Sequence, residues 1–210
     1  MTKRILIGAL FSITVFLTMW FVWSAFEVPS QRAARIFPSP VPKHDLGKAL
    51  IVYYSAGGNT AEVAQRISAM TGGTLLELKT RKPYPDAPML YLRAKLYLSG
   101  SKYPELETVS LDFSMYDVIF VGSPVWWRTV SLPVLSFLFE SDFGGKTVVP
   151  FCTQGGRSGE FFQRFAREAG NAKLVGGKEF SRVSSIDPAN LDQTISSWLS
   201  EVTEEIARQY

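Results

Sequence analysis

The 210-residue chain contains a single cysteine, Cys152, and a single histidine, His44. One cysteine excludes a disulfide within the chain and leaves the redox compartment undetermined. With no histidine beyond His44, the rest of the chain has no Ser–His or Cys–His pair for nucleophilic catalysis and no His and Cys cluster for zinc. We therefore expect no metal, and we expect any chemistry to be carried by a cofactor.

The chain also lacks a strong excess of either charge. Its formal net charge is +3, and setting aside Lys3, Arg4 and Glu27 leaves +2. Domains that bind nucleic acid gather Lys and Arg to neutralise phosphates. The near balance gives no sign of such a surface, so we expect no nucleic acid among the partners.

One stretch, Ile5 to Phe26, has no charged residue over 22 positions. As a helix it would be about 33 Å long, enough for a hydrocarbon core of about 30 Å. Trp20 and Trp23 lie towards its far end, as interfacial aromatics do. We expect residues 1–26 to form an uncleaved single-pass anchor that meets membrane lipid through residues 5–26. A cleaved signal peptide is the alternative, but its apolar region would be only ~7–15 residues long.

The basic residues on the two sides of this segment nearly balance, and they determine the orientation weakly. A short tail before a single span favours an extracytoplasmic domain. Residues 27–47 contain four prolines and predict an extended, semi-rigid linker. His44 lies in this linker, where we expect it to be solvated.

Residues 48–210 are long enough for one domain with a substantial core. Strand-like apolar runs alternate there with helical patterns. Strands are expected near 49–54, 74–78, 117–122 and 146–152 and within 172–183, and helices through Met70 and near 89–98, 131–140, 159–169 and from Asp187 onwards. This alternation predicts an α/β fold with a doubly wound, five-stranded parallel sheet covered on both faces.

The loop from Ser55 to Thr60 joins the first strand to the first helix. Glycines followed by a helix N-terminus can hold an anion, because backbone N–H groups and the helix dipole face it. The loop has no Lys for a triphosphate and no G-x-G-x-x-G spacing for a dinucleotide. Its neutral donors suit a monophosphate. An ordinary tight turn, with Asn59 or Thr60 as helix cap, remains open.

Ligands of such sheets bind at the carboxyl ends of the strands. Ser123 to Arg128 follow the third strand, and Trp126 and Trp127 offer two adjacent aromatic faces for a planar ring. Thr153 to Gly159 follow the fourth strand and offer glycines and polar donors. The tryptophans are also compatible with covering the sheet edge or forming a partner patch.

Together the three loops resemble those of the flavodoxin family, in particular a bacterial branch with a Trp-Trp second loop, over about residues 48–185. The resemblance implies the strand order 2-1-3-4-5, with FMN between the first and third strands. The residues that it implies for FMN contact are Ser55, Ala56, Gly57, Gly58, Asn59 and Thr60, then Ser123, Pro124, Val125, Trp126 and Trp127, and then Thr153, Gln154, Gly155, Gly156, Arg157 and Ser158. The chain departs from the family pattern at Gly57, Gln154 and Arg157, in its lack of acidity, and in its anchor.

The expected function is electron transfer by a membrane-tethered FMN protein, with a redox protein or a quinone as partner. An FMN-dependent reductase that uses NAD(P)H and a quinone is one alternative. A non-redox binding module is another. Arg128 and Arg157 adjoin the loops, and nearby cations are expected to favour anionic reduced flavin and raise its potential.

Overall fold

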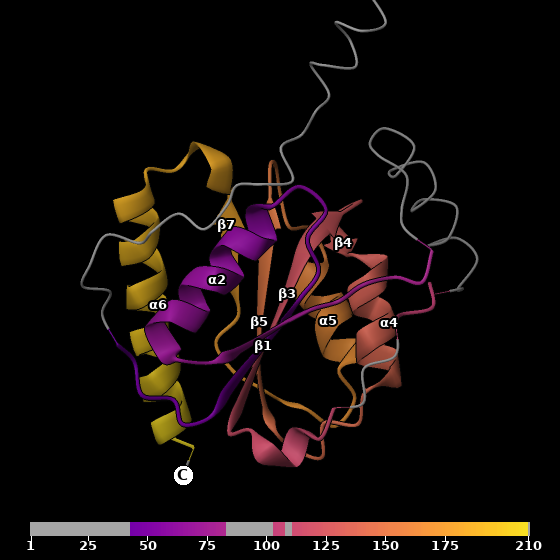
Figure 1. The fold of residues 1–210 in the computed structure, drawn as a ribbon, viewed down its shortest axis with the longest axis horizontal. Coiled ribbons are helices and arrows are strands. Elements are labelled where there is room, and N and C mark those ends of the chain that lie inside the picture. The colour runs from indigo at the N-terminus through magenta and orange to yellow at the C-terminus, as the bar shows by residue number, and fades with distance from the viewer. Residues whose placement is uncertain (1–42, 83–102, 108–110, 210) are drawn as a thin grey trace, which may run out of the picture. The chain divides into compact units, whose positions relative to one another are not determined.

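The computed structural model describes residues 43–82, 103–107 and 111–209 (Figure 1). Its central sheet has the order β2-β1-β3-β5-β6, and these neighbours run parallel. The strands are β1 (Ala49–Tyr53), β2 (Thr74–Glu77), β3 (Val118–Trp126), β4 (Thr129–Val130), β5 (Thr147–Gln154), β6 (Lys173–Leu174) and β7 (Lys178–Ser181). The predicted parallel α/β sheet is confirmed, and its order follows the expected 2-1-3-4-5.

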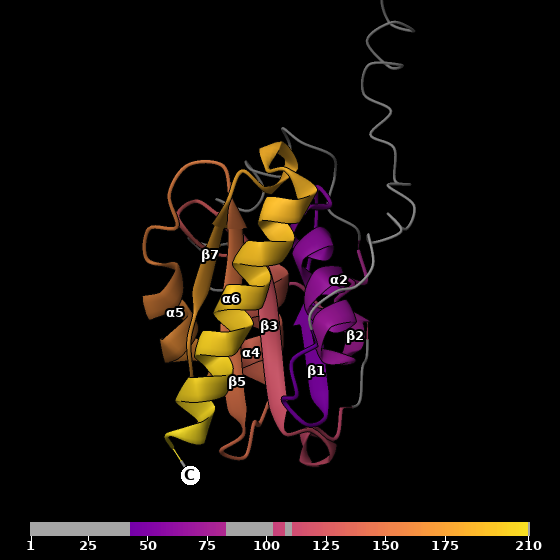
Figure 2. The ribbon, with the colours of Figure 1, turned by 90° about the vertical axis from the view of Figure 1, so that its left-hand side faces the viewer.

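Helices cover the two faces of the sheet (Figures 1 and 2). The helices are α2 (Asn59–Thr71), α4 (Leu132–Glu140), α5 (Phe161–Glu168) and α6 (Pro188–Ala207), with short 3₁₀ turns η1 (Phe113–Met115) and η2 (Val183–Ser185). Ile51 of β1 belongs to the core cluster on the α2 and α6 side, and Val52 belongs to the cluster on the α4 and α5 side. This alternation follows from the pleat of a strand, and it makes β1 apolar at every position.

The fifth strand position is divided between β6 and β7. β6 pairs with the first part of β5, and β7 pairs with its last four residues. Pro150 lies between the two segments on β5 and has no N–H to donate to a neighbouring strand. Gly177 lies between β6 and β7 in the chain, and a Cβ at this position would lie 2.6 Å from Cε1 of Phe162. A single continuous fifth strand is therefore interrupted at this point.

The connection after β3 differs from the expected loop. β3 continues to Trp126 and turns back into β4, which pairs with it antiparallel through Trp126 and Thr129. A two-residue hairpin turn of type I′ needs positive φ at both central residues and usually contains Asn and Gly. Here those residues are Trp127 and Arg128, so the turn gave no recognisable signal in the sequence.

His44 contacts the domain rather than lying in solvent, so that expectation was wrong. Its backbone N–H donates to the Met70 carbonyl at 2.8 Å, and its Nε2 lies 3.0 Å from Oγ of Ser196. Burial lowers the pKa of the His44 imidazole. The segment just before β1 is thereby attached to both α2 and α6.

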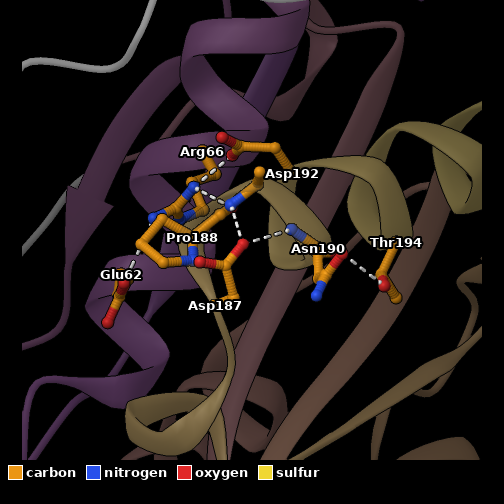
Figure 3. A network of polar contacts seen from close by, with 8 residues as sticks. Glu62, Arg66, Asp187, Pro188, Asn190, Asp192 and Thr194 are labelled. Carbon is orange, nitrogen blue, oxygen red and sulfur yellow. Dashed lines mark hydrogen bonds and ion pairs between the residues drawn. The ribbon is translucent and has the colours of Figure 1, made fainter.

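A buried arginine also connects α2 with α6 (Figure 3). Arg66 is 2% exposed and forms ion pairs with Glu62 of its own helix and Asp192 of α6. Its guanidinium group also donates to the Pro188 carbonyl at 3.3 Å. Asp187 caps α6 through the N–H groups of Ala189 and Asn190, as the Asp-Pro pair predicted.

Across residues 43–82, 103–107 and 111–209, no helix is both long and apolar enough to cross a membrane. The predicted anchor at 1–26, most of the 27–47 linker and the predicted helix near 89–98 lie outside the described residues.

Candidate functional site

The three loops singled out in the sequence meet at the carboxyl edge of the sheet. Tyr53 pairs with Gly122, and Pro124 pairs with Thr153. The Thr60 and Thr153 hydroxyl oxygens lie 2.8 Å apart and join the first loop to the third. Predicted site residues that are almost a hundred positions apart in the chain are thus brought into contact.

The first loop forms an open cradle before α2. Gly58 has a φ of +84° and begins the helix without a side-chain cap. The N–H groups of Asn59, Thr60 and Ala61 belong to the first turn, where no intrahelical acceptor exists. A Cβ added at Gly57 or Gly58 would meet no atom within 4 Å, so space is open above the loop.

Ser55 lies at the start of the same loop. Its Oγ is buried and has no hydrogen-bond partner in the part of the chain that the structure describes. Leaving a buried hydroxyl unpaired costs about 1–3 kcal/mol. An uncapped helix start, open glycines and an unpaired hydroxyl together fit an anionic group such as a phosphate.

The Thr60 side chain contacts the third loop. The side chain is only 1% exposed, and its hydroxyl is bonded to Thr153. The side chain of Thr60 therefore braces the first loop against the third, while its backbone N–H remains in the first turn of α2.

The two tryptophans of the second loop lie in different environments. Trp126 is 2% exposed and packs edge-on against Tyr54, with ring centroids 5.5 Å apart. Trp127 is 48% exposed. Trp126 is the last residue of β3, whereas Trp127 lies in the turn with a left-handed backbone, so the two rings do not form one face. The prediction of two adjacent aromatic faces is corrected to one accessible ring, that of Trp127.

Ser123 also differs from its predicted place at the ring. It is fully buried, and its Oγ accepts a hydrogen bond of 3.0 Å from the Ser131 backbone N–H. The two serine hydroxyl oxygens lie 2.9 Å apart. Ser123 thus fastens β3 to the start of α4, while Pro124 and Val125 remain partly exposed.

The turn that presents Trp127 has an unusual backbone. Trp127 and Arg128 have φ values of 51° and 63°. Left-handed conformations cost non-glycine residues about 1–2 kcal/mol each. The turn is held by the third loop, because the Glu160 N–H donates to the Arg128 carbonyl at 2.8 Å. Gly159 packs so closely that a Cβ there would lie 2.4 Å from Cβ of Arg128.

The third loop is hydrogen-bonded to β7 at its first residues, and its middle residues border open space. The Gln154 amide donates to Glu179 and Ser181 of β7, and its Oε1 is buried without a partner among the described residues. Gly155 and Gly156 face open space, Arg157 is exposed and Ser158 is half-buried. A planar group therefore has room beside these glycines.

Two groups near the site are kept protonated by burial. Cys152 is completely buried, and burial raises the pKa of its thiol well above its usual range. Burial, helped by the charge of Glu77, raises the pKa of Tyr54 to about 12. Cys152 is thus the buried hydrophobe expected from the sequence, and neither group supplies a base at neutral pH.

The sequence analysis missed two residues that shape the site. Tyr54 supports the buried Trp126, and Gly159 permits the clamp on the Arg128 turn. A glycine directly before a helical pattern was visible in the sequence, but its contact partner lies 31 positions earlier and depends on the hairpin.

The chain is similar in sequence and in fold to known flavoproteins. The sequence profile of the Flavodoxin family fits residues 48–193. A flavoprotein in complex with FMN from Lactobacillus acidophilus NCFM is 26% identical, with a TM-score of 0.60 over 72% of this chain and 97% of that chain. A candidate flavoprotein from Bacteroides eggerthii DSM 20697 is also 26% identical, with a TM-score of 0.60 over 74% of this chain and 98% of that chain. No curated protein sequence matches the chain. Since the profile covers most of its length, the chain belongs to the flavodoxin family.

Proposed function

We propose that residues 48–210 bind FMN at the three loops and act in electron transfer. The observation that carries this proposal is the buried Ser55 hydroxyl, which has no hydrogen-bond partner among the described residues and belongs to the loop leading to the uncapped start of α2. Such a donor set fits a phosphate on an uncharged loop. Family membership and the FMN complex of the similar Lactobacillus protein support the same cofactor.

Each loop then has a distinct role. Ser55 and the first-turn N–H groups of α2 hold the phosphate, and the exposed Trp127 and the backbone at Gly155 and Gly156 border the ring. Thr60 and Thr153 hold the first and third loops together. Bound FMN supplies one- or two-electron transfer. The surrounding side chains would position it.

The domain is proposed to work at a membrane surface. Residues 5–26 would anchor it to lipid, and the domain would lie on the extracytoplasmic side. The full chain is expected in the membrane fraction and is expected to be released by detergent but not by high salt. Protease added outside intact cells should cleave the domain. Protection of the domain from the protease would indicate the opposite orientation in the membrane.

The absorbance spectrum of the purified full-length protein is the first test, with the released cofactor identified by mass. We expect a yellow protein that releases FMN and can be reduced chemically. A colourless protein that stays colourless after FMN is added would contradict the proposal and support a non-redox binding module. Unaided turnover of NAD(P)H with a quinone would favour the reductase over the carrier.

A further inference from the structure

Three exposed arginines surround the carboxyl edge of the sheet. Arg128 lies in the β3–β4 turn, Arg157 follows β5, and Arg182 follows β7. We call these three residues the arginine rim. They come from three separate connections, so no single motif of the sequence reveals them as a group.

The backbone brings these connections together. The Arg128 carbonyl accepts a hydrogen bond from the Glu160 N–H. Arg128 also packs against Gly159, which is two positions after Arg157. The Arg182 N–H donates to the Gln154 carbonyl at 2.7 Å, at the end of β5. All three arginines are therefore attached to the loop that follows β5, beside the proposed flavin ring.

The charge of the rim is poorly compensated. No hydrogen bond or ion pair joins its guanidinium groups to any other described residue, whereas Arg66 and Arg164 are both paired. Three carboxylates lie near these loops. Glu160 is exposed in the same loop, Glu179 accepts from Gln154, and Asp187 caps α6. None of these carboxylates forms an ion pair with a guanidinium group of the rim, so the rim guanidinium groups remain available to a partner.

We propose that this edge is a docking surface for an electron-transfer protein with a carboxylate-rich face. The inference rests on the proposed function, since it places the partner over the flavin site. Exposed arginines around an accessible tryptophan match the composition of interface hot spots. Guanidinium groups on separate exposed loops suit a broad acidic surface better than one small anion, and opposite charges accelerate encounter.

The test uses full-length protein in non-ionic detergent, loaded with FMN and reduced with dithionite. Its oxidation is followed with acidic plastocyanin and with basic mitochondrial cytochrome c as probes. Each reduced flavin gives up two electrons and one proton, so two copper(II) or two iron(III) centres are reduced. The test variant replaces Arg128, Arg157 and Arg182 with Gln. The control replaces Lys48, Arg167 and Arg208, exposed at the other end of the sheet, with Gln and changes the net charge equally.

At low ionic strength we expect the rim variant to lose about tenfold in rate with plastocyanin, and the control variant less than about twofold. Added salt should remove the difference, because it screens exposed charges. Equal rates for the two variants, or a preference of the native protein for cytochrome c that needs the rim, would overturn the proposal. Rim-dependent oxidation of NADPH by the protein alone would assign the arginines to a dinucleotide instead. If FMN does not bind, no flavin is reduced, and it is the proposed function that fails.

Discussion

At the residue scale, the Ser55 hydroxyl should destabilise the FMN-free protein and stabilise the complex with FMN. It is buried, and none of the residues that the structure describes is its hydrogen-bond partner. For Ser55→Ala we therefore expect the free energy of unfolding of the FMN-free protein to rise by about 1 kcal/mol. FMN affinity should fall by about 1.5–3 kcal/mol, roughly ten- to a hundredfold, because a hydrogen bond to a charged phosphate is lost. Chemical unfolding and flavin-fluorescence titration measure the two effects.

Ser68→Ala is the matched control for this change. Its hydroxyl donates to the Gly73 carbonyl at 2.6 Å at the far end of α2. The control should lower stability slightly and leave FMN affinity unchanged. Riboflavin lacks the phosphate, so its affinity should barely respond to Ser55→Ala. A parallel loss of riboflavin affinity would mean that Ser55 does not contact the phosphate.

At the scale of the element, the β3–β4 turn stores backbone strain that substitution can release. Arg128 has a φ of 63°, and asparagine tolerates this region better than other non-glycine residues. We expect Arg128→Asn to raise the free energy of unfolding by about 1 kcal/mol. Arg128→Ala removes the same charge without relieving the strain, so it should give no gain. A comparable gain in both variants would show that charge, not backbone conformation, limits stability here.

The junction of α2 and α6 depends on Arg66 in a similar way (Figure 3). Arg66→Ala would leave Glu62 and Asp192 without their cation in a largely buried place. We expect a loss of about 3 kcal/mol in the free energy of unfolding, measured with denaturant. Glu62→Gln keeps an acceptor oxygen and should cost less than about 1 kcal/mol. A loss below that value for Arg66→Ala would mean that water replaces the ion pairs.

At the scale of the whole molecule, His44 makes stability depend on pH near neutrality. Burial lowers its pKa in the folded protein, so the unfolded chain binds the proton more tightly. The contribution of His44 is complete above an unfolded pKa of about 6.5 and is lost as pH falls through the lower folded value. Because His44 is the only histidine, the free energy of unfolding should drop more for the native protein than for His44→Gln between about pH 7.5 and about pH 5.5. Equal drops, measured in urea, would show that His44 is not the responsible group.

The sequence was sufficient to predict the segments of the parallel sheet and the loops that meet at its carboxyl edge. β1 is apolar at every position, and the Gly57-Gly58 loop precedes a helical pattern, so short-range periodicity and composition were sufficient. Asp187 and Pro188 likewise predicted the start of α6, because a helix cap depends only on neighbouring residues. Apolar strand runs and helix caps of this kind depend on neighbouring residues alone, so they can be recognised without the tertiary structure.

Only the tertiary structure decided which residues of the candidate site are buried, which are exposed and which contact one another. Trp126 is buried and Trp127 exposed because β3 continues through the predicted loop, and the hairpin depends on a clamp from Gly159 and Glu160. Thr60 contacts Thr153 because the first and third loops meet at the sheet edge. Arg128, Arg157 and Arg182 likewise become neighbours only through strand order. Contacts between residues far apart in the chain depend on packing and register, which a local pattern does not encode.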